Sequence, residues 1–127
     1  MIVDDHPSTR GMIRKFLGCI PGITFCECVS GEEAVRLARG FKPDWVTMDI
    51  HMPGLNGFES TKALLLEHPS LRVLIVTADY QPQFPKMSRD AGAVGLLAKE
   101  NILGLRVILE REMRNEDSFP SSDADLP

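Results

Sequence analysis

The sequence has no long hydrophobic run and no basic segment at its start. Its longest apolar stretches, 64–66 and 73–76, fall far below the roughly 20 residues that a bilayer crossing requires. No basic amino-terminal segment leads into an apolar stretch, so a cleavable secretion signal is not expected. We therefore expect a soluble, cytoplasmic protein that makes no contact with a membrane.

Basic charge and cysteine are also scarce. The formal net charge is −4, whereas proteins that bind nucleic acid directly carry basic patches. The three cysteines, Cys19, Cys26 and Cys28, form an odd set without the paired spacing of a zinc site. We expect small buried thiols, with no disulfide framework and no direct contact with nucleic acid.

The composition that remains is that of one globular domain. The 127 residues are 43% hydrophobic and 25% charged, which is close to ordinary globular usage. From about residue 114 the sequence becomes acidic and serine-rich and loses its periodicity. We therefore expect one domain over residues 1–113 and a disordered acidic tail over residues 114–127.

Helical and extended patterns alternate along the domain. Apolar residues recur at helical spacing over 12–20 and 34–41. Ser30 and Asn56 are each followed three residues later by glutamate, which is typical of a helix start. The other expected elements are strands at 23–29, 44–48, 72–77 and 94–98, a helix from 56 to about 68, a short helix at 85–91 and a last helix at 102–113.

The expected strand at 72–77 is continuously apolar in its centre, which suits a strand covered by helices on both faces. Residues 1–3 count as the stub of a first strand, and five strand–helix units result. This alternation predicts an α/β fold in which a doubly wound parallel sheet carries helices on both faces.

Chemically reactive side chains stand at the ends of these strands. Asp4 and Asp5 follow the first strand and Asp49 follows the third, while Thr77 ends the fourth and Lys99 follows the fifth. In open α/β sheets, ligands bind beyond the carboxyl ends of the strands, where the strand order reverses. We therefore expect these five side chains to converge on one rim of the sheet.

Such a set favours phosphoryl chemistry. Two carboxylates about 4 Å apart repel by roughly 4 kcal/mol at an effective dielectric of about 20, so three of them favour a hard divalent cation such as Mg²⁺. Thr77 and Lys99 offer a hydrogen-bond donor and a positive charge to phosphoryl oxygens. Asp49, central in the sheet, is placed to be the nucleophile that becomes an aspartyl phosphate.

The motifs that carry these residues resemble those of a known family. They are Val3-Asp4-Asp5-His6-Pro7, the run from Met48 to Gly57, Thr77-Ala78, and the run from Gly92 to Lys99. In order and spacing they resemble the CheY-like receiver domain of two-component response regulators, and most closely the receivers joined to a LuxR-type helix-turn-helix. The resemblance covers residues 1 to about 113 and implies a flavodoxin-like, five-stranded parallel sheet of order 2-1-3-4-5.

The resemblance also implies roles for the residues. Asp49 would accept a phosphoryl group from a histidine kinase or a histidine phosphotransfer protein. Asp5, Asp49 and the backbone carbonyl of His51 would bind Mg²⁺ directly, and Asp4 would bind it through water. Lys99 would contact the phosphoryl oxygens, and Thr77 would swing to hydrogen-bond them and so change the affinity for partners.

Partners follow from the same resemblance. A downstream protein would bind the face formed by the short helix at 85–91, the last strand and the final helix. Leu103 and Val107 widen the apolar stripe of that helix and favour a partner or homodimer contact. As a complete chain, the protein would act as a stand-alone signalling phosphoacceptor without a DNA-binding domain. It would assist its own phosphorylation and dephosphorylation but would not be an enzyme.

Four features depart from the family pattern. Only residues 1–3 precede the acidic pair, so the first strand should lose hydrogen bonds and burial, and a misassigned start codon is one hypothesis. Leu96 stands where a rotating aromatic residue is common, and Glu100 stands where proline is common. Pro82 and Pro85 follow the fourth strand and should shorten the next helix.

The other candidate residues are Asp79 and the histidines. His51 and Asp79 flank the phosphoryl position and could tune its lifetime, or they could be ordinary loop residues. His6 and His68 are interpreted as a loop residue and a helix-end residue.

A pseudo-receiver that binds a partner without phosphorylation is the main alternative function. A Mg²⁺-dependent phosphohydrolase is disfavoured, because its Asp-x-Asp spacing and a substrate cap are missing.

Overall fold

The computed structural model describes residues 1–115, with side chains as far as Arg111. Five strands alternate with five α-helices and one short 3₁₀ helix. In chain order they are β1 (Ile2–Val3), α1 (Pro7–Leu17), β2 (Glu27–Cys28), α2 (Gly31–Phe41), β3 (Trp45–Met48), α3 (Gly57–Glu67), β4 (Arg72–Thr77), α4 (Phe84–Ala91), β5 (Gly95–Ala98), η1 (Lys99–Asn101) and α5 (Gly104–Asn115). The predicted tail begins within the last turn of α5, and residues 116–127 lie outside the described residues.

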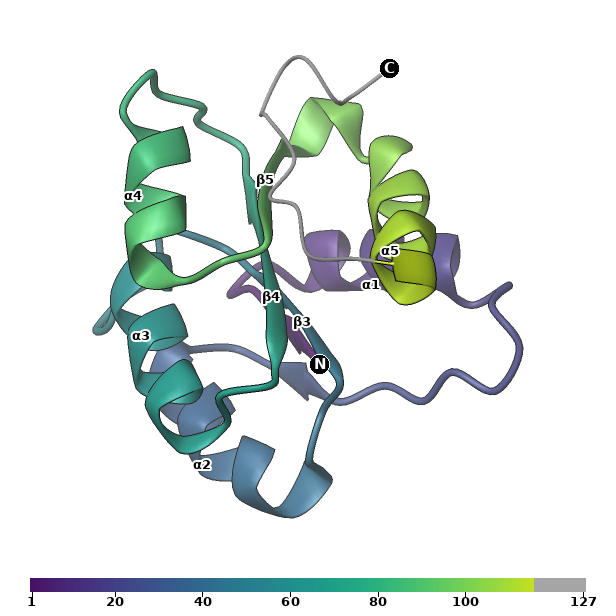
Figure 1. The fold of residues 1–127 in the computed structure, drawn as a ribbon, viewed down its shortest axis with the longest axis horizontal. Coiled ribbons are helices and arrows are strands. Elements are labelled where there is room, and N and C mark those ends of the chain that lie inside the picture. The colour runs from purple at the N-terminus through teal and green to yellow at the C-terminus, as the bar shows by residue number, and fades with distance from the viewer. Residues whose placement is uncertain (116–127) are drawn as a thin grey trace.

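The sheet lies between two layers of helices. Its strand order is β2-β1-β3-β4-β5 with all neighbours parallel, which confirms the α/β fold and the order 2-1-3-4-5. Helices α2, α3 and α4 cover one face, and α1 and α5 cover the other (Figure 1). The strand order reverses between β1 and β3, so the carboxyl ends of these two strands border the crevice that such sheets use for ligands.

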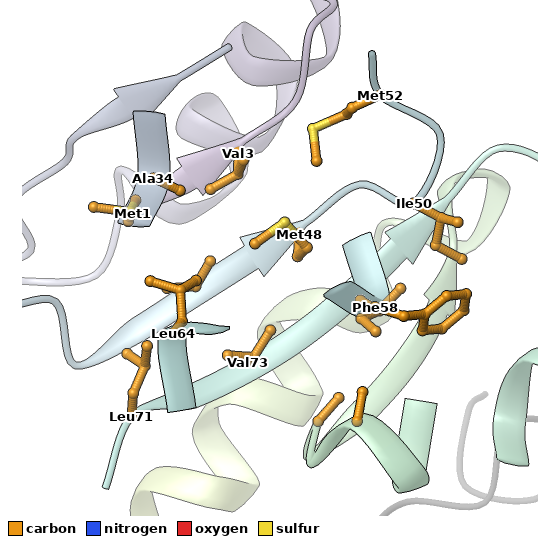
Figure 2. Packing of buried hydrophobic residues seen from close by; sticks show 14 of the residues in the cluster. Met1, Val3, Ala34, Met48, Ile50, Met52, Phe58, Leu64, Leu71 and Val73 are labelled. Carbon is orange, nitrogen blue, oxygen red and sulfur yellow. The ribbon is translucent and has the colours of Figure 1, made fainter. Parts of the chain in front are cut away.

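Two hydrophobic clusters fill the space between the layers. Val73 and Ile75 of β4 belong to the cluster beneath α2–α4, whereas Leu74 and Val76 belong to the one beneath α1 and α5. Successive strand residues point to opposite faces, so burial of both faces explains the continuous apolar run. Figure 2 shows part of the first cluster, in which Leu64 of α3 lies near Leu71 and Val73.

Two helix starts form as the sequence predicts. The Ser30 hydroxyl accepts a hydrogen bond from the Glu33 amide at 3.1 Å. Asn56 and Glu59 form a reciprocal capping box, with both hydrogen bonds at 2.9 Å. These caps satisfy amides that have no partner inside the helix, and the second one fixes where the chain turns after β3.

Several expected ends of strands and helices are wrong, and so is the expected burial of one cysteine. The strand predicted at 23–29 is reduced to Glu27–Cys28, because its neighbour β1 offers only two residues for pairing. The first helix ends at Leu17, ahead of the predicted Ile20. Cys28 is buried as expected, but Cys19 is exposed at the end of α1.

The departures from the family pattern have visible structural results. Helix α4 spans eight residues against eleven in each of α1, α2 and α3, with Pro85 in its first turn, where a missing amide is harmless. Leu96 is 1% exposed and packs in the core. The expected loss of burial in the first strand is not observed, because Ile2 and Val3 are each 1% exposed. A cavity of about 410 Å³ is lined partly by Met1, Phe25 and Trp45.

The helices of residues 1–115 include none that is long and apolar enough to cross a bilayer. Leu103 and Val107 are 73% and 48% exposed, so the apolar stripe of the final helix does extend onto the surface.

The packing of α3 gives a first testable prediction. Leu64→Ala should lower the free energy of unfolding by about 2–5 kcal/mol, because a fully buried leucine leaves a cavity when truncated. Leu66→Ala is the matched control on the same helix: Leu66 is 85% exposed, so its loss should change stability by about 0.5 kcal/mol or less. Urea denaturation of both variants measures the difference, and equal effects would contradict the packing described.

Candidate functional site

Parallel strands bring the predicted site residues to one edge of the sheet. Val3 of β1 pairs with Met48 of β3, so Asp4 and Asp49, the next residue on each strand, leave adjacent strands at the same level. The Asp49 amide donates to the Val3 carbonyl at 2.9 Å and fixes this register. Thr77 ends β4 opposite Ala98 of β5, and Lys99 follows directly.

Lys99 lies between two buried carboxylates. Its Nζ is 2.9 Å from Asp4 Oδ2 and 3.6 Å from Asp49 Oδ1. Asp4 is 2% exposed and Asp49 is 5% exposed, while the Lys99 side chain is 14% exposed. Low exposure makes these charges interact strongly, so one ammonium group compensates two carboxylates at this point.

This arrangement makes ionisation of the Asp49 carboxyl group less favourable. Burial and the nearby Asp4 carboxylate raise the pKa of Asp49 above its ordinary value of 3.8, with a smaller contribution from Asp5. The Lys99 ammonium and a hydrogen bond from the Ile50 amide act in the opposite direction but do not cancel the rise in pKa. The carboxylate is therefore a group that gains from any added cation.

Asp5 and His6 complete an acidic pocket. Single ligand atoms from Asp4, Asp5, His6 and Asp49 all lie within 4.8 Å of one another. Among the described residues, Asp5 Oδ1 is a buried oxygen that accepts no hydrogen bond. Asp5 Oδ1 does pair with the His6 ring nitrogen at 3.1 Å, and several carboxylate oxygens in one pocket fit a hard cation such as Mg²⁺.

His6 is the residue that sequence reasoning missed. It is the N-cap of α1, and its Nδ1 lies 3.2 Å from Asp4 Oδ1 and 3.1 Å from Asp5 Oδ1. His6 lies in the loop between β1 and α1, as predicted, but its contact with both aspartates was not predicted. The only sequence signal was its position directly after two aspartates, which does not say where the ring points.

Arg10 was also missed, one turn further along α1. Its guanidinium donates to the Asp4 carbonyl at 2.7 Å and to Glu27 Oε1 at 3.0 Å. These two bonds connect α1 and β2 to the backbone of Asp4. Arg10 therefore helps to position the residue that carries that carboxylate.

The fourth strand supplies a hydroxyl, which is hydrogen-bonded to the loop that follows the strand. Thr77 is fully buried, and its Oγ1 accepts a hydrogen bond from the Asp79 amide at 3.2 Å. His51 Nε2 lies 3.6 Å from Asp79 Oδ2, and the His51 ring packs against Phe84 at 6.0 Å. The loops after β3 and β4 thus meet beside the pocket.

A glycine allows the chain to turn tightly behind Asp49. A Cβ at Gly57 would collide with the Asp49 carbonyl, and the Gly57 amide donates to the Ile50 carbonyl at 2.9 Å. This close approach of α3 to the end of β3 requires a residue without a side chain.

Comparisons with known proteins agree with this geometry. The family described as "Response regulator receiver domain" matches residues 1–109. Over 100 residues the chain is 41% identical to Response regulator GacA of Pseudomonas viridiflava, which covers 78% of this chain and 47% of that protein. This chain belongs to the response regulator receiver family. It is also 35% identical over 100 residues to Response regulator UvrY of Escherichia coli strain K12, covering 78% of this chain and 46% of UvrY.

Solved receiver structures share the fold. A LuxR-family two-component response regulator from Aurantimonas sp. SI85-9A1 is 34% identical with a TM-score of 0.77, over 87% of this chain and 83% of that one. The chemotaxis protein CheY4 of Vibrio cholerae is 28% identical with a TM-score of 0.77, over 86% and 92%. The chain spans about half the length of the curated relatives it matches.

The raised pKa of Asp49 predicts a pH-dependent effect of Asp49→Asn. Because the folded pKa lies above the unfolded one, ionised Asp49 destabilises the fold at neutral pH, and this destabilisation disappears as pH falls through the folded pKa towards 3.8. Without divalent cations, the variant should therefore be more stable than the wild type at pH 7. The difference should vanish below pH 3.8.

Urea denaturation at a series of pH values measures this difference. Asp90→Asn is the control, because Asp90 is an exposed surface residue paired with Lys86, and surface changes of this kind stay within about 0.5 kcal/mol. A destabilised Asp49→Asn at neutral pH would mean that Lys99 outweighs burial and Asp4 repulsion.

Proposed function

We propose that this receiver accepts a phosphoryl group on Asp49 from a histidine kinase or a histidine phosphotransfer protein in a two-component phosphorelay. The observation that supports this most directly is the Asp49 carboxylate, buried at the carboxyl edge of the sheet 3.6 Å from the Lys99 ammonium. A carboxylate oxygen would attack phosphorus while the bond from phosphorus to the donor's imidazole nitrogen breaks. The nitrogen keeps that electron pair, and an aspartyl phosphate forms.

The surrounding side chains suit this step. The Lys99 ammonium and the Thr77 hydroxyl would bind the phosphoryl oxygens, which requires the hydroxyl to turn its proton away from the Asp79 carbonyl, to which it donates at 3.4 Å. Mg²⁺ would be held by Asp4, Asp5, Asp49 and the His51 carbonyl, a set of oxygen donors that includes the buried Asp5 Oδ1. When bound, Mg²⁺ neutralises charge between the carboxylates and the phosphoryl group.

We further propose a signalling role rather than a catalytic one. The phosphoryl group would be stored on Asp49, and the protein would assist only its own phosphorylation and dephosphorylation, in the cytoplasm where such a donor acts. A downstream protein would bind the α4-β5-α5 face. The exposed Leu103 and Val107 support a protein partner or a second copy of the chain at the start of α5. The net charge of −4 argues against direct contact of this domain with nucleic acid.

Phosphorylation itself is the central prediction. Incubation with acetyl phosphate and Mg²⁺ should add one phosphoryl group per chain, detected by intact-protein mass spectrometry and located on Asp49 by peptide mapping. Asp49→Asn should abolish the modification, because an amide is not a nucleophile here. Removing Mg²⁺ with a chelator should suppress it, because the acidic pocket then repels the anionic donor.

Asp79→Asn is the matched control, since Asp79 lies beside the pocket without belonging to its metal ligands. It should still accept one phosphoryl group. No mass increase in wild type would support the alternative, a pseudo-receiver that binds its partner without phosphorylation. Turnover of many phosphate esters would support the phosphohydrolase.

The pairing of His51 with Asp79 gives a prediction about the phosphoryl lifetime. The His51 ring contacts both Asp79 and Phe84 in the loops that follow β3 and β4, and we expect it to limit the access of water to a phosphoryl group on Asp49. His51→Ala should shorten the half-life of the aspartyl phosphate by roughly threefold to tenfold, a change of about 0.6–1.4 kcal/mol in the barrier. His68→Ala, at the far end of α3, serves as the control. Equal half-lives in all three proteins would make His51 an ordinary loop residue.

A further inference from the structure

Asp4 is held through its backbone as well as through its carboxylate. Its amide donates to the Cys28 carbonyl at 3.1 Å, and its carbonyl accepts from the Arg10 guanidinium at 2.7 Å. Its Oδ1 accepts from the His6 amide at 2.9 Å, and its Oδ2 lies 2.9 Å from Lys99 Nζ. These contacts together fix one aspartate, and the shortest of them comes from Arg10.

The sheet alone holds the end of β1 weakly. Strand β1 is two residues long and pairs with β2 and β3 through Ile2 and Val3. The Asp4 amide adds one further bond to β2, whereas the Asp4 carbonyl is bonded by helix α1 through Arg10. A hydrogen bond from a charged guanidinium is about twice as strong as one between neutral groups. Arg10 therefore supplies much of the restraint at the point where Asp4 leaves the strand.

Arg10 is itself fixed in place. Its side chain is 14% exposed, and its Nε donates to Glu27 Oε1 at 3.0 Å. Because the donors of a guanidinium lie in a rigid plane, the bonds to Glu27 and to the Asp4 carbonyl together set its orientation. Arg14 bonds the other oxygen of Glu27 at 2.9 Å and stacks on Phe25. Of these two arginines, Arg10 is the one whose guanidinium also bonds the Asp4 backbone.

This restraint matters because Asp4 and Asp49 repel each other. The two residues are 2% and 5% exposed, so water screens their charges poorly. The repulsion would be relieved if the end of β1 moved away from β3. Such a movement would also separate two of the carboxylates that together favour a cation. A bond to the Asp4 carbonyl opposes this movement without occupying a carboxylate oxygen.

We propose that Arg10 is a positioning residue for cation binding: by holding the Asp4 carbonyl, it keeps the Asp4 carboxylate beside Asp49 although the two repel. The inference rests on the Mg²⁺ site of the proposed function, and it adds a residue that touches neither the ion nor the phosphoryl group. Charge and position have opposite effects here. Loss of a positive charge beside an acidic pocket strengthens cation binding, whereas release of the Asp4 backbone weakens it, so the sign of the change separates the two.

The test measures the affinity of the unphosphorylated chain for Mg²⁺ alone by isothermal titration calorimetry. Arg10→Gln should raise the dissociation constant about tenfold, because loss of a partner of a metal ligand costs about 10–100-fold in affinity. Arg10→Lys keeps the charge but cannot make both bonds at once, so it should raise the constant about threefold or more. Arg14→Gln is the matched control: it removes the same charge from the same carboxylate partner and should stay within about twofold of wild type.

Phosphorylation by acetyl phosphate gives a second measurement. In Arg10→Gln, the Mg²⁺ concentration for half the maximal rate should rise about tenfold, while the rate at saturating Mg²⁺ stays within about twofold, because Arg10 does not contact the phosphoryl group. A residue that only stabilises the fold would move neither value. Circular dichroism and urea denaturation verify folding, and Arg10→Lys carries the test if Arg10→Gln does not fold.

Two outcomes would overturn the inference alone. If both Arg10 variants bind Mg²⁺ as tightly as wild type or more tightly, Arg10 only stabilises the fold. If Arg14→Gln weakens Mg²⁺ binding as much as Arg10→Gln does, the loss comes from the Glu27 ion pairs and not from the Asp4 carbonyl. In both cases wild type still binds Mg²⁺ and gains a phosphoryl group, so the proposed function stands. A wild type that does neither contradicts the proposed function and this inference together.

Discussion

Asp4 and Asp49 repel each other from neighbouring strands, and the sheet does not let them separate. The pairing of Val3 with Met48 and the hydrogen bond from the Asp49 amide hold both carboxylates at the same level. Their burial prevents water from screening the repulsion. Lys99 balances part of this charge, and the remainder creates the demand for a cation that defines the pocket.

The uncompensated negative charge in the pocket can be maintained only because the scaffold is firmly packed. Helices on both faces bury each residue of the centre of β4, so its strand cannot shift without exposing apolar surface. Gly57 brings the start of α3 against the end of β3, and the Asn56 cap fixes the turn. Stability from the two hydrophobic clusters therefore offsets the unfavourable charges at the rim.

How far the sequence predicts this protein depends on whether a feature is local. The run at 72–77 and the Ser30 and Asn56 caps are local signals, and the structure agrees with them. The length of β2 is not local: residues 23–26 have strand-like side chains, but β1 is too short to pair with them. A sequence pattern reports side chains, whereas a strand also needs a partner for its backbone.

The residues of the candidate site also differ in whether the sequence could predict them. Its acids and Lys99 could be predicted because the carboxyl ends of parallel strands meet at one rim. His6 could not, because the direction of its ring depends on the extended backbone of an N-cap (φ −99, ψ 114). Arg10 acts on the Asp4 carbonyl, and a contact with backbone leaves no pattern in the side chains.

The connection from the site to the rest of the fold also runs through aromatic packing that the family pattern does not suggest. Leu96 is buried on β5, and it has no polar atom to exchange between environments. Instead, Phe84 at the start of α4 packs against Phe58 at 5.5 Å and against His51 at 6.0 Å. Phe84 is thus the residue through which the loop after β3 contacts the first turn of α4.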